Sequence, residues 1–114
     1  MKVKRSPITT HVLDVSRGKA LSNIPVILNC LKDSKWVEIA KSVTDEDGRC
    51  ENLLSTEDLL LKTQYRLVFD TKNLFDGNIF YPEVAISFQV TQPHEHHHVP
   101  LLLSPFGYST YRGT

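Results

Sequence analysis

Histidine is the residue type best suited to do chemistry in this 114-residue chain, because imidazole titrates near neutral pH, binds metals and exchanges protons. Four of the five histidines lie within residues 93–100 (PHEHHHVP). In an extended strand successive side chains alternate between faces, so His96 and His98 are predicted to point one way and His97 the other. A polar edge strand with exposed imidazoles would carry the same pattern, so the cluster alone does not establish a site.

The fifth histidine and one arginine are further candidates. His11 lies in an apolar stretch and shares a predicted strand face with Thr9 and Leu13. A histidine in that setting is more often a satisfied buried group than a catalytic one. Arg49 follows the turn sequence DEDG, where a solvated charge is the simplest interpretation. The acidic residues of that turn lack the longer loop and the terminal Glu of a calcium-binding hand, so no calcium site is predicted.

Two chemistries are compatible with these residues. His96 and His98 form an H-x-H pair which, with His11, could bind zinc and an activated water. Alternatively, one imidazole could act as a general base on water while Arg49 stabilises the developing oxyanion, with no metal involved. The spacing of the residues does not choose between these two mechanisms.

Short strands are predicted to carry these side chains. The chain consists largely of short runs rich in β-branched and aromatic residues, separated by turn residues. The predicted strands cover residues 8–15, 24–31, 36–43, 49–52, 64–70, 83–90, 99–103 and 107–112, and residues 55–62 and 71–76 are helix candidates. This pattern predicts a β-sandwich that forms a single domain over residues 1–114, with residues 1–6 expected to be flexible.

Composition excludes several classes of partner. The 13 basic residues balance the 13 acidic ones, so the chain predicts neither nucleic acid nor an anionic membrane as a partner. No apolar run approaches the roughly 20 residues of a membrane span, and no secretory signal is recognisable. We therefore expect a cytoplasmic protein, with a peroxisomal location through an atypical signal as the alternative. Cys30 and Cys50 are expected to be reduced, buried and inert.

Several segments resemble the transthyretin-like family. Near the start, residues 8–14 (ITTHVLD) precede Gly18 and the segment 24–26 (IPV). Residues 80–84 (FYPEV) also fit, and residues 98–110 (HVPLLLSPFGYST) are similar to the family's C-terminal signature. The resemblance covers residues 6–114. It implies an all-β, transthyretin-like β-sandwich of two four-stranded sheets with one short helix, near residues 71–76.

The family divides into secreted carriers of thyroid hormone and 5-hydroxyisourate hydrolases, which act after urate oxidation. Three features here resemble the hydrolases. His11 stands where the carriers have a lysine, and His98 stands where they have a non-catalytic residue. Residues 111–114 (YRGT) are similar to the hydrolases' terminal tetrapeptide, which usually ends in Ser, so Thr114 departs from the pattern. A non-catalytic, transthyretin-like carrier of a small ligand is the alternative function.

The resemblance to the hydrolases also implies a site and an assembly. Catalysis is implied for His11, Arg49 and His98. Contacts with the substrate are implied for four other residues: His96, Tyr111, Arg112 and Thr114. The implied reaction converts the small molecule 5-hydroxyisourate to 2-oxo-4-hydroxy-4-carboxy-5-ureidoimidazoline, with no cofactor and no metal. Family members are homotetramers, so we expect a homotetramer whose sites lie at the dimer–dimer interface.

Overall fold

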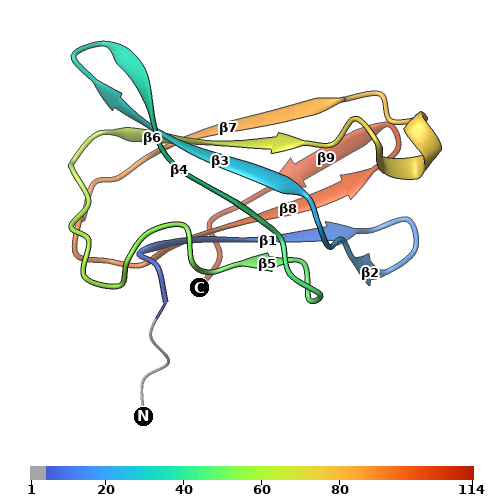
Figure 1. Ribbon diagram of the computed structural model, residues 1–114, viewed down its shortest axis with the longest axis horizontal. Coiled ribbons are helices and arrows are strands. Elements are labelled where there is room, and N and C mark those ends of the chain that lie inside the picture. The colour runs from blue at the N-terminus through green and yellow to red at the C-terminus, as the bar shows by residue number, and fades with distance from the viewer. Residues whose placement is uncertain (1–4) are drawn as a thin grey trace.

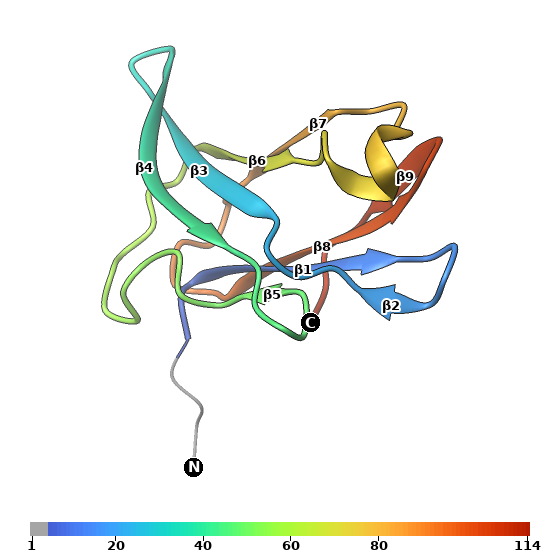
Figure 2. The ribbon, with the colours of Figure 1, turned by 45° about the vertical axis from the view of Figure 1, so that its right-hand side comes forward.

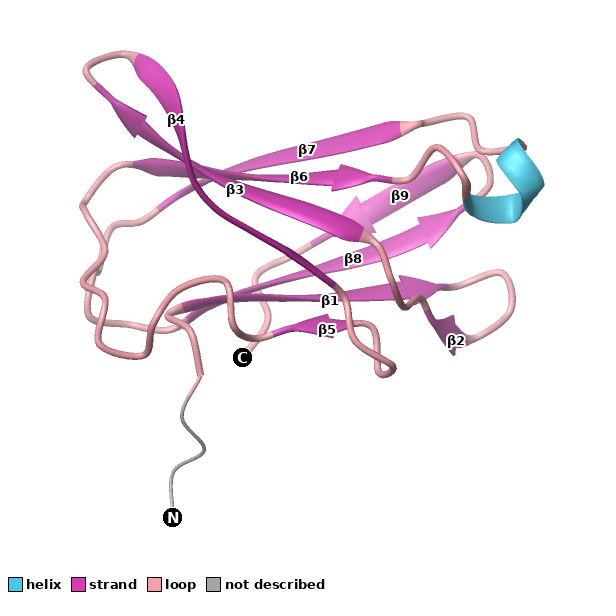
Figure 3. Cartoon of the chain, viewed as in Figure 1, coloured by secondary structure: helices cyan, strands magenta, loops and turns pink. Residues whose placement is uncertain are grey.

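The computed structural model describes residues 5–114 and shows two β-sheets facing each other (Figure 1; Figure 3). The first sheet contains β1 (Ile8–Asp14), β2 (Lys19–Ala20), β5 (Arg49–Cys50), β8 (His97–Ser104) and β9 (Gly107–Thr110). The second sheet contains β3 (Pro25–Lys32), β4 (Lys35–Val43), β6 (Gln64–Asp70) and β7 (Glu83–Gln89). The predicted all-β sandwich is confirmed.

Pairing within the first sheet brings distant parts of the chain together. Its order is β2-β1-β8-β9, and β5 pairs with β1. Strands β1 and β8 run side by side and parallel (Figure 2). Their register sets Thr9 opposite His98. Strand β5 runs antiparallel to β1, with His11 opposite Arg49. Residues near position 10 therefore lie between residues near positions 50 and 98.

Side-chain alternation separates the core from the outer face of this sheet. Within β8, Val99, Leu101 and Leu103 are buried in the hydrophobic core. His97 points the same way: it is only 4% exposed, and its ring lies 6.4 Å from that of Phe88 on the opposite sheet. Because neighbours on a strand alternate, His98 points away from the face of His97, as predicted, and this is the outer face of the sheet.

The predicted strands are confirmed to within two residues at their ends. Strand β2 was not predicted, because two residues are too few to show alternation. It extends the first sheet to five strands, where the resemblance implied four.

The helix predictions differ more from the structure. Residues 55–62 form no helix. A turn closes from Ser55 to Asp58, and the Leu61 N–H donates to the Tyr65 hydroxyl instead of a helical carbonyl. Residues 71–76 give only the short 3-10 element η1 (Leu74–Gly77), which is interrupted by left-handed residues at its centre. No helix within residues 5–114 is long and apolar enough to cross a membrane.

Ser6, near the start of the described part of the chain, is buried and hydrogen-bonded to the domain. The Ser6 hydroxyl accepts hydrogen bonds from the N–H groups of Ile8 and Leu54, and the Ser6 side chain is buried. Ser6 therefore packs against the domain, and residues 1–4 of the segment expected to be flexible lie outside the described part of the chain. Cys30 and Cys50 are free and buried, as predicted, and burial raises the pKa of the Cys50 thiol.

Asp14 fixes the end of β1. Its buried carboxylate accepts hydrogen bonds from the Ser16 N–H at 2.9 Å, the Ser16 hydroxyl at 2.6 Å and Arg17 Nε at 2.7 Å. Burial by itself would raise the pKa of this carboxyl, but the hydrogen bonds outweigh it and lower the pKa below 3.8. Asp14 therefore stabilises the fold in its ionised form.

We expect Asp14→Ala to lower the free energy of unfolding by about 1–3 kcal/mol at pH 7, since several donors lose a buried acceptor. A folded-state pKa below the unfolded value gives stability that is present above that value and lost as the pH falls. The difference between wild type and variant should therefore shrink below about pH 4. Urea unfolding at several pH values measures both effects.

Asp70→Ala is the matched control, because the Asp70–Lys72 ion pair at 2.7 Å is exposed. Its loss should change stability by less than about 1 kcal/mol. Equal losses in the two variants would contradict the role given to Asp14.

Candidate active site

A cleft of about 310 Å³ opens on the outer face of the first sheet, where β1, β5 and β8 meet the C-terminal residues. Its lining combines basic, acidic and apolar side chains: Arg5, Thr9, His11, Leu13, Arg49, Glu51, His98, Pro100, Tyr111, Gly113 and Thr114. All three residues predicted to be catalytic are among them. Two of the four predicted substrate contacts, Tyr111 and Thr114, line the cleft as well.

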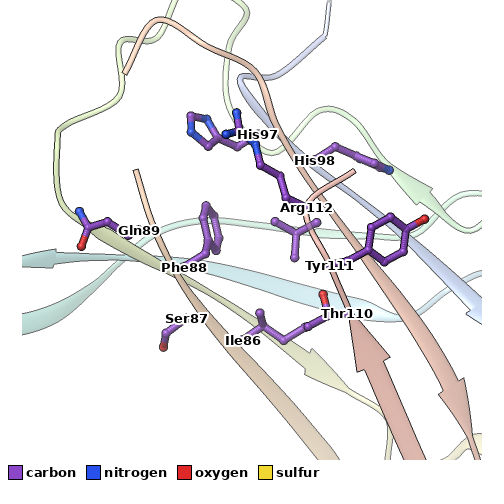
Figure 4. A pocket seen from close by; sticks show the side chains of 10 residues that line it. Ile86, Ser87, Phe88, Gln89, His97, His98, Thr110, Tyr111 and Arg112 are labelled. Carbon is purple, nitrogen blue, oxygen red and sulfur yellow. The ribbon is translucent and has the colours of Figure 1, made fainter. Parts of the chain in front are cut away.

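The other two predicted contacts, His96 and Arg112, do not line this cleft. His96 is linked to the cleft through Thr9. His96 Nε2 lies 3.0 Å from the Thr9 hydroxyl, and Thr9 lines the cleft. Arg112 lines a second pocket of about 260 Å³ between β7 and the C-terminal residues, and this pocket shares His98 and Tyr111 with the cleft. Figure 4 shows the Arg112 side chain reaching toward His97 while Tyr111 points to the other side. Arg112 therefore lies beside the cleft and is not among the residues that line it.

His11 is held in a defined tautomer. Its Nε2 lies 2.8 Å from the carbonyl oxygen of Asp47. A carbonyl oxygen only accepts hydrogen bonds, so Nε2 carries the proton and, in the neutral ring, Nδ1 keeps a lone pair. The Asp47 carbonyl belongs to the turn that leads into β5, so the same turn positions both His11 and Arg49.

His98 is held neutral by its surroundings. Burial lowers its pKa most, nearby Arg49, His11 and Arg5 lower it further, and the negative charge of Glu51 opposes them. Its Nδ1 lies 2.8 Å from Thr9 Oγ1. Among residues 5–114, its Nε2 has no hydrogen-bond partner and is free to meet a ligand.

The C-terminal residues complete the cleft by packing on His98. The Gly113 N–H donates to the His98 carbonyl oxygen at 2.8 Å, and the Thr110 hydroxyl donates to the Pro100 carbonyl at 2.7 Å. A Cβ at position 113 would lie 2.5 Å from His98 Cδ2, so only glycine allows this approach. The close packing brings Thr114 to the cleft beside the imidazole.

Sequence reasoning did not single out Arg5, Thr9 or Glu51 as site residues. Strand alternation did place Thr9 on the face of His11, which was the available signal. The sequence gives no such signal for Arg5 and Glu51, because they lie just outside strands β1 and β5. Only the pairing of these strands in the folded sheet places the two residues at the cleft.

A zinc site would have needed His11, His96 and His98 to converge. Among residues 5–114, no group of three or more His, Cys, Asp or Glu side chains is placed to hold one metal ion. His96 and His98 both face the Thr9 hydroxyl, and His11 Nε2 faces a backbone carbonyl.

The sequence profile of the HIUase/Transthyretin family matches residues 8–113. The chain belongs to this family. It is 40% identical to the 5-hydroxyisourate hydrolase of Mus musculus, and the alignment covers 100% of both proteins. It is 44% identical to the uric acid degradation bifunctional protein TTL of Arabidopsis thaliana over 99% of this chain, but spans only 39% of that longer protein.

The fold of the family is also evident among solved structures. Sea bream transthyretin, solved in complex with thyroxine, superposes with a TM-score of 0.85 at 28% identity, covering 96% of each chain. The family thus includes both hydrolases and a hormone-binding protein of the same shape, and the side chains of the cleft must distinguish between them.

We expect Gly113→Ala to displace the C-terminal residues from His98, because the added methyl group would overlap the ring. Loss of the hydrogen bond from residue 113 to the His98 carbonyl should speed amide exchange at residue 113 roughly 5-fold, corresponding to ~1 kcal/mol. Hydrogen exchange followed by NMR measures this rate.

Gly107→Ala is the control in the same hairpin, since its added Cβ would meet nothing closer than 4.0 Å. Unchanged exchange at residue 113 in Gly113→Ala, together with unchanged His98 ring resonances, would show that the close packing is not required.

Proposed function

We propose that this chain hydrolyses 5-hydroxyisourate to 2-oxo-4-hydroxy-4-carboxy-5-ureidoimidazoline, a step in urate degradation. The observation that carries the proposal is the convergence of His11, Arg49 and His98 on one cleft, although β1, β5 and β8 are far apart in the sequence. The hydrolase from mouse, 40% identical over its whole length, supports the choice of substrate.

The mechanism uses the imidazoles of His11 and His98 and the guanidinium of Arg49. His98 Nε2 removes a proton from a water molecule, and the lone pair on His11 Nδ1 accepts the second hydrogen of that water and orients it. The water oxygen adds to the ring carbonyl carbon, and Arg49 binds the oxygen that gains negative charge. The carbon–nitrogen bond then breaks as His98 returns its proton to the leaving nitrogen. The new carboxylic acid passes the second proton of the water to His11 Nδ1 and on to solvent, which leaves a carboxylate. No step needs a cofactor.

The C-terminal residues bind the substrate in this proposal. Tyr111 and Thr114 line the cleft beside His98 and can hydrogen-bond a polar heterocycle through their hydroxyl groups. His96 and Arg112 act indirectly: the Arg112 guanidinium donates to the His96 carbonyl oxygen at 3.2 Å, which ties the C-terminal residues to the start of β8.

We also infer a homotetramer whose cleft faces a second dimer. The open cleft and the exposed Tyr111 side chain leave room for a neighbouring subunit to close the site. Sedimentation equilibrium at micromolar concentration should give four times the 13.0 kDa chain mass. A monomer that is fully active would contradict this assembly.

The test of the proposed function generates the unstable substrate in place. Urate oxidase converts urate to 5-hydroxyisourate, and the decay of its absorbance is followed with and without this protein. Thyroxine binding is measured in parallel by isothermal titration calorimetry. Faster decay without thyroxine binding supports the hydrolase, whereas thyroxine binding with no change in decay would identify a carrier.

We expect His11→Ala, Arg49→Ala and His98→Ala each to lower kcat/KM by roughly 10²- to 10⁴-fold, because each variant removes a proton acceptor or the oxyanion partner. Circular dichroism should show an unchanged fold. His94→Ala is the control, because His94 is exposed and lies outside the cleft, and it should keep wild-type activity. Near-normal turnover in the three cleft variants would refute the assignment.

The pH dependence follows from the lowered pKa of His98. The neutral base is the active form, so kcat/KM should stay high as the pH falls and decline only below 6.5, the ordinary value. Arg49→Gln removes a positive charge, which should raise the pKa of His98 and make its ring titrate at higher pH. Titration of the His98 ring by NMR measures the shift, and an unchanged pKa in Arg49→Gln would contradict this electrostatic coupling.

A further inference from the structure

We propose that Thr9 is a positioning residue that holds His98 in the tautomer with its proton on Nδ1, so that the Nε2 lone pair faces the cleft. This inference rests on the proposed function, which makes His98 Nε2 the proton acceptor. It assigns to a buried hydroxyl the task of keeping the base in its active form.

The Thr9 hydroxyl lies between two imidazoles. Its Oγ1 is 2.8 Å from His98 Nδ1 and 3.0 Å from His96 Nε2. The two rings are nearly parallel, with centroids 6.3 Å apart and an interplanar angle of 16°. Parallel pairing of β1 with β8 sets Thr9 directly opposite His98 and thereby fixes these distances.

Burial keeps water away from the Thr9 hydroxyl and favours the neutral form of both imidazoles. Thr9 is only 1% exposed, so little water reaches its hydroxyl to compete for the hydrogen bonds. Burial and nearby positive charges lower the pKa of His96 to about 4 and also lower that of His98, so both rings are neutral at neutral pH. Each neutral ring has one N–H donor and one lone pair.

A single hydroxyl hydrogen then couples the two tautomers. Thr9 donates to one imidazole nitrogen and accepts from the other, which allows two arrangements. If His98 Nδ1–H donates to Thr9, the hydroxyl donates to His96 Nε2, and His98 Nε2 keeps its lone pair. In the reverse arrangement His98 Nε2 carries the proton and cannot act as a base.

The first arrangement, in which His98 Nδ1–H donates to Thr9, also stabilises the imidazolium that His98 forms during the reaction. After His98 takes a proton from water it becomes an imidazolium with two N–H groups. The bond from its Nδ1–H to Thr9 Oγ1 persists and becomes charge-assisted, and hence stronger. His96 Nε2 continues to accept the hydroxyl hydrogen, so no other proton has to move.

Three substitutions test the role of the hydroxyl in the full-length protein. Thr9→Val keeps the shape of the side chain and removes the hydroxyl. Thr9→Ser keeps the hydroxyl. Thr10→Val is the matched control, because Thr10 is equally buried on the same strand but donates to the Val99 carbonyl at 2.6 Å and not to a histidine.

We expect Thr9→Val to lower kcat roughly 10- to 100-fold, the range found when a hydrogen bond that orients a metal-ligating imidazole is removed, while KM changes little. Thr9→Ser should restore kcat to near the wild-type value, and Thr10→Val should leave it near wild type. Equal losses of kcat in Thr9→Val and Thr10→Val, or wild-type kcat in Thr9→Val, would overturn the proposal.

A spectroscopic measurement tests the tautomer directly and does not depend on turnover. Nitrogen-15 NMR of the wild-type imidazoles should show His98 protonated at Nδ1 and unprotonated at Nε2. His96→Phe removes the nitrogen that accepts the Thr9 hydrogen, so the hydroxyl becomes free to donate to His98 Nδ1. The Nε2–H tautomer of His98 should therefore increase in this variant.

A wild-type His98 protonated at Nε2 would refute the proposal, as would a tautomer that is indifferent to His96→Phe. These outcomes differ from failure of the proposed function itself. A wild-type protein that does not hydrolyse 5-hydroxyisourate refutes that function, whereas the tautomer of His98 is still decided by NMR.

Discussion

The parallel pairing of β1 with β8 is the constraint on which the cleft depends. It places Thr9 opposite His98 and His11 opposite Pro100 along one edge of β1. The other edge of β1 pairs with β5, which sets Arg49 opposite His11. A slip of one residue in either register would turn the side chains of that strand to the other face of the sheet. The hydrophobic residues of β8, which must face the core, therefore also determine where His98 lies.

Electrostatics give this arrangement its chemical character. The chain carries no net charge, yet Arg5 and Arg49 both lie beside His98 in the cleft. Their positive charges disfavour an imidazolium, which keeps the ring available as a proton acceptor. The same charges favour the negative oxygen that forms when water attacks a carbonyl. Glu51 opposes this effect on His98 and moderates the loss of basicity.

Much of the fold could be predicted from local patterns. Alternation along residues 64–70 and 83–90 defines strands because each has one buried face. Residues 55–62 resemble a helix in sequence. In the structure, however, Leu60 packs in the core and the Leu61 N–H donates to the Tyr65 hydroxyl, and no local sequence pattern reveals these contacts. Tertiary packing therefore overrides local propensity in this segment.

The residues of the site could be predicted only in part. His11, Arg49 and His98 stand out by residue type and by resemblance to the family, and the structure brings them together. Arg112 was predicted to contact the substrate, but it lines the adjoining pocket and not the cleft, whereas its neighbour Tyr111 lines both. The contacts of Thr9 depend on pairing between strands that are 89 residues apart, which a sequence pattern does not contain.

That separation also has a consequence for how the molecule folds. Parallel strands joined through most of the chain must lose a large loop-closure entropy before their contacts form. The cleft cannot take shape on any short fragment, because β1 and β8 enclose nearly the whole domain between them. Such topologies fold slowly, on the order of milliseconds to seconds, so the site should be among the last features of the protein to form. Until then, the edges of β1 and β8 remain unpaired and open to association with other chains.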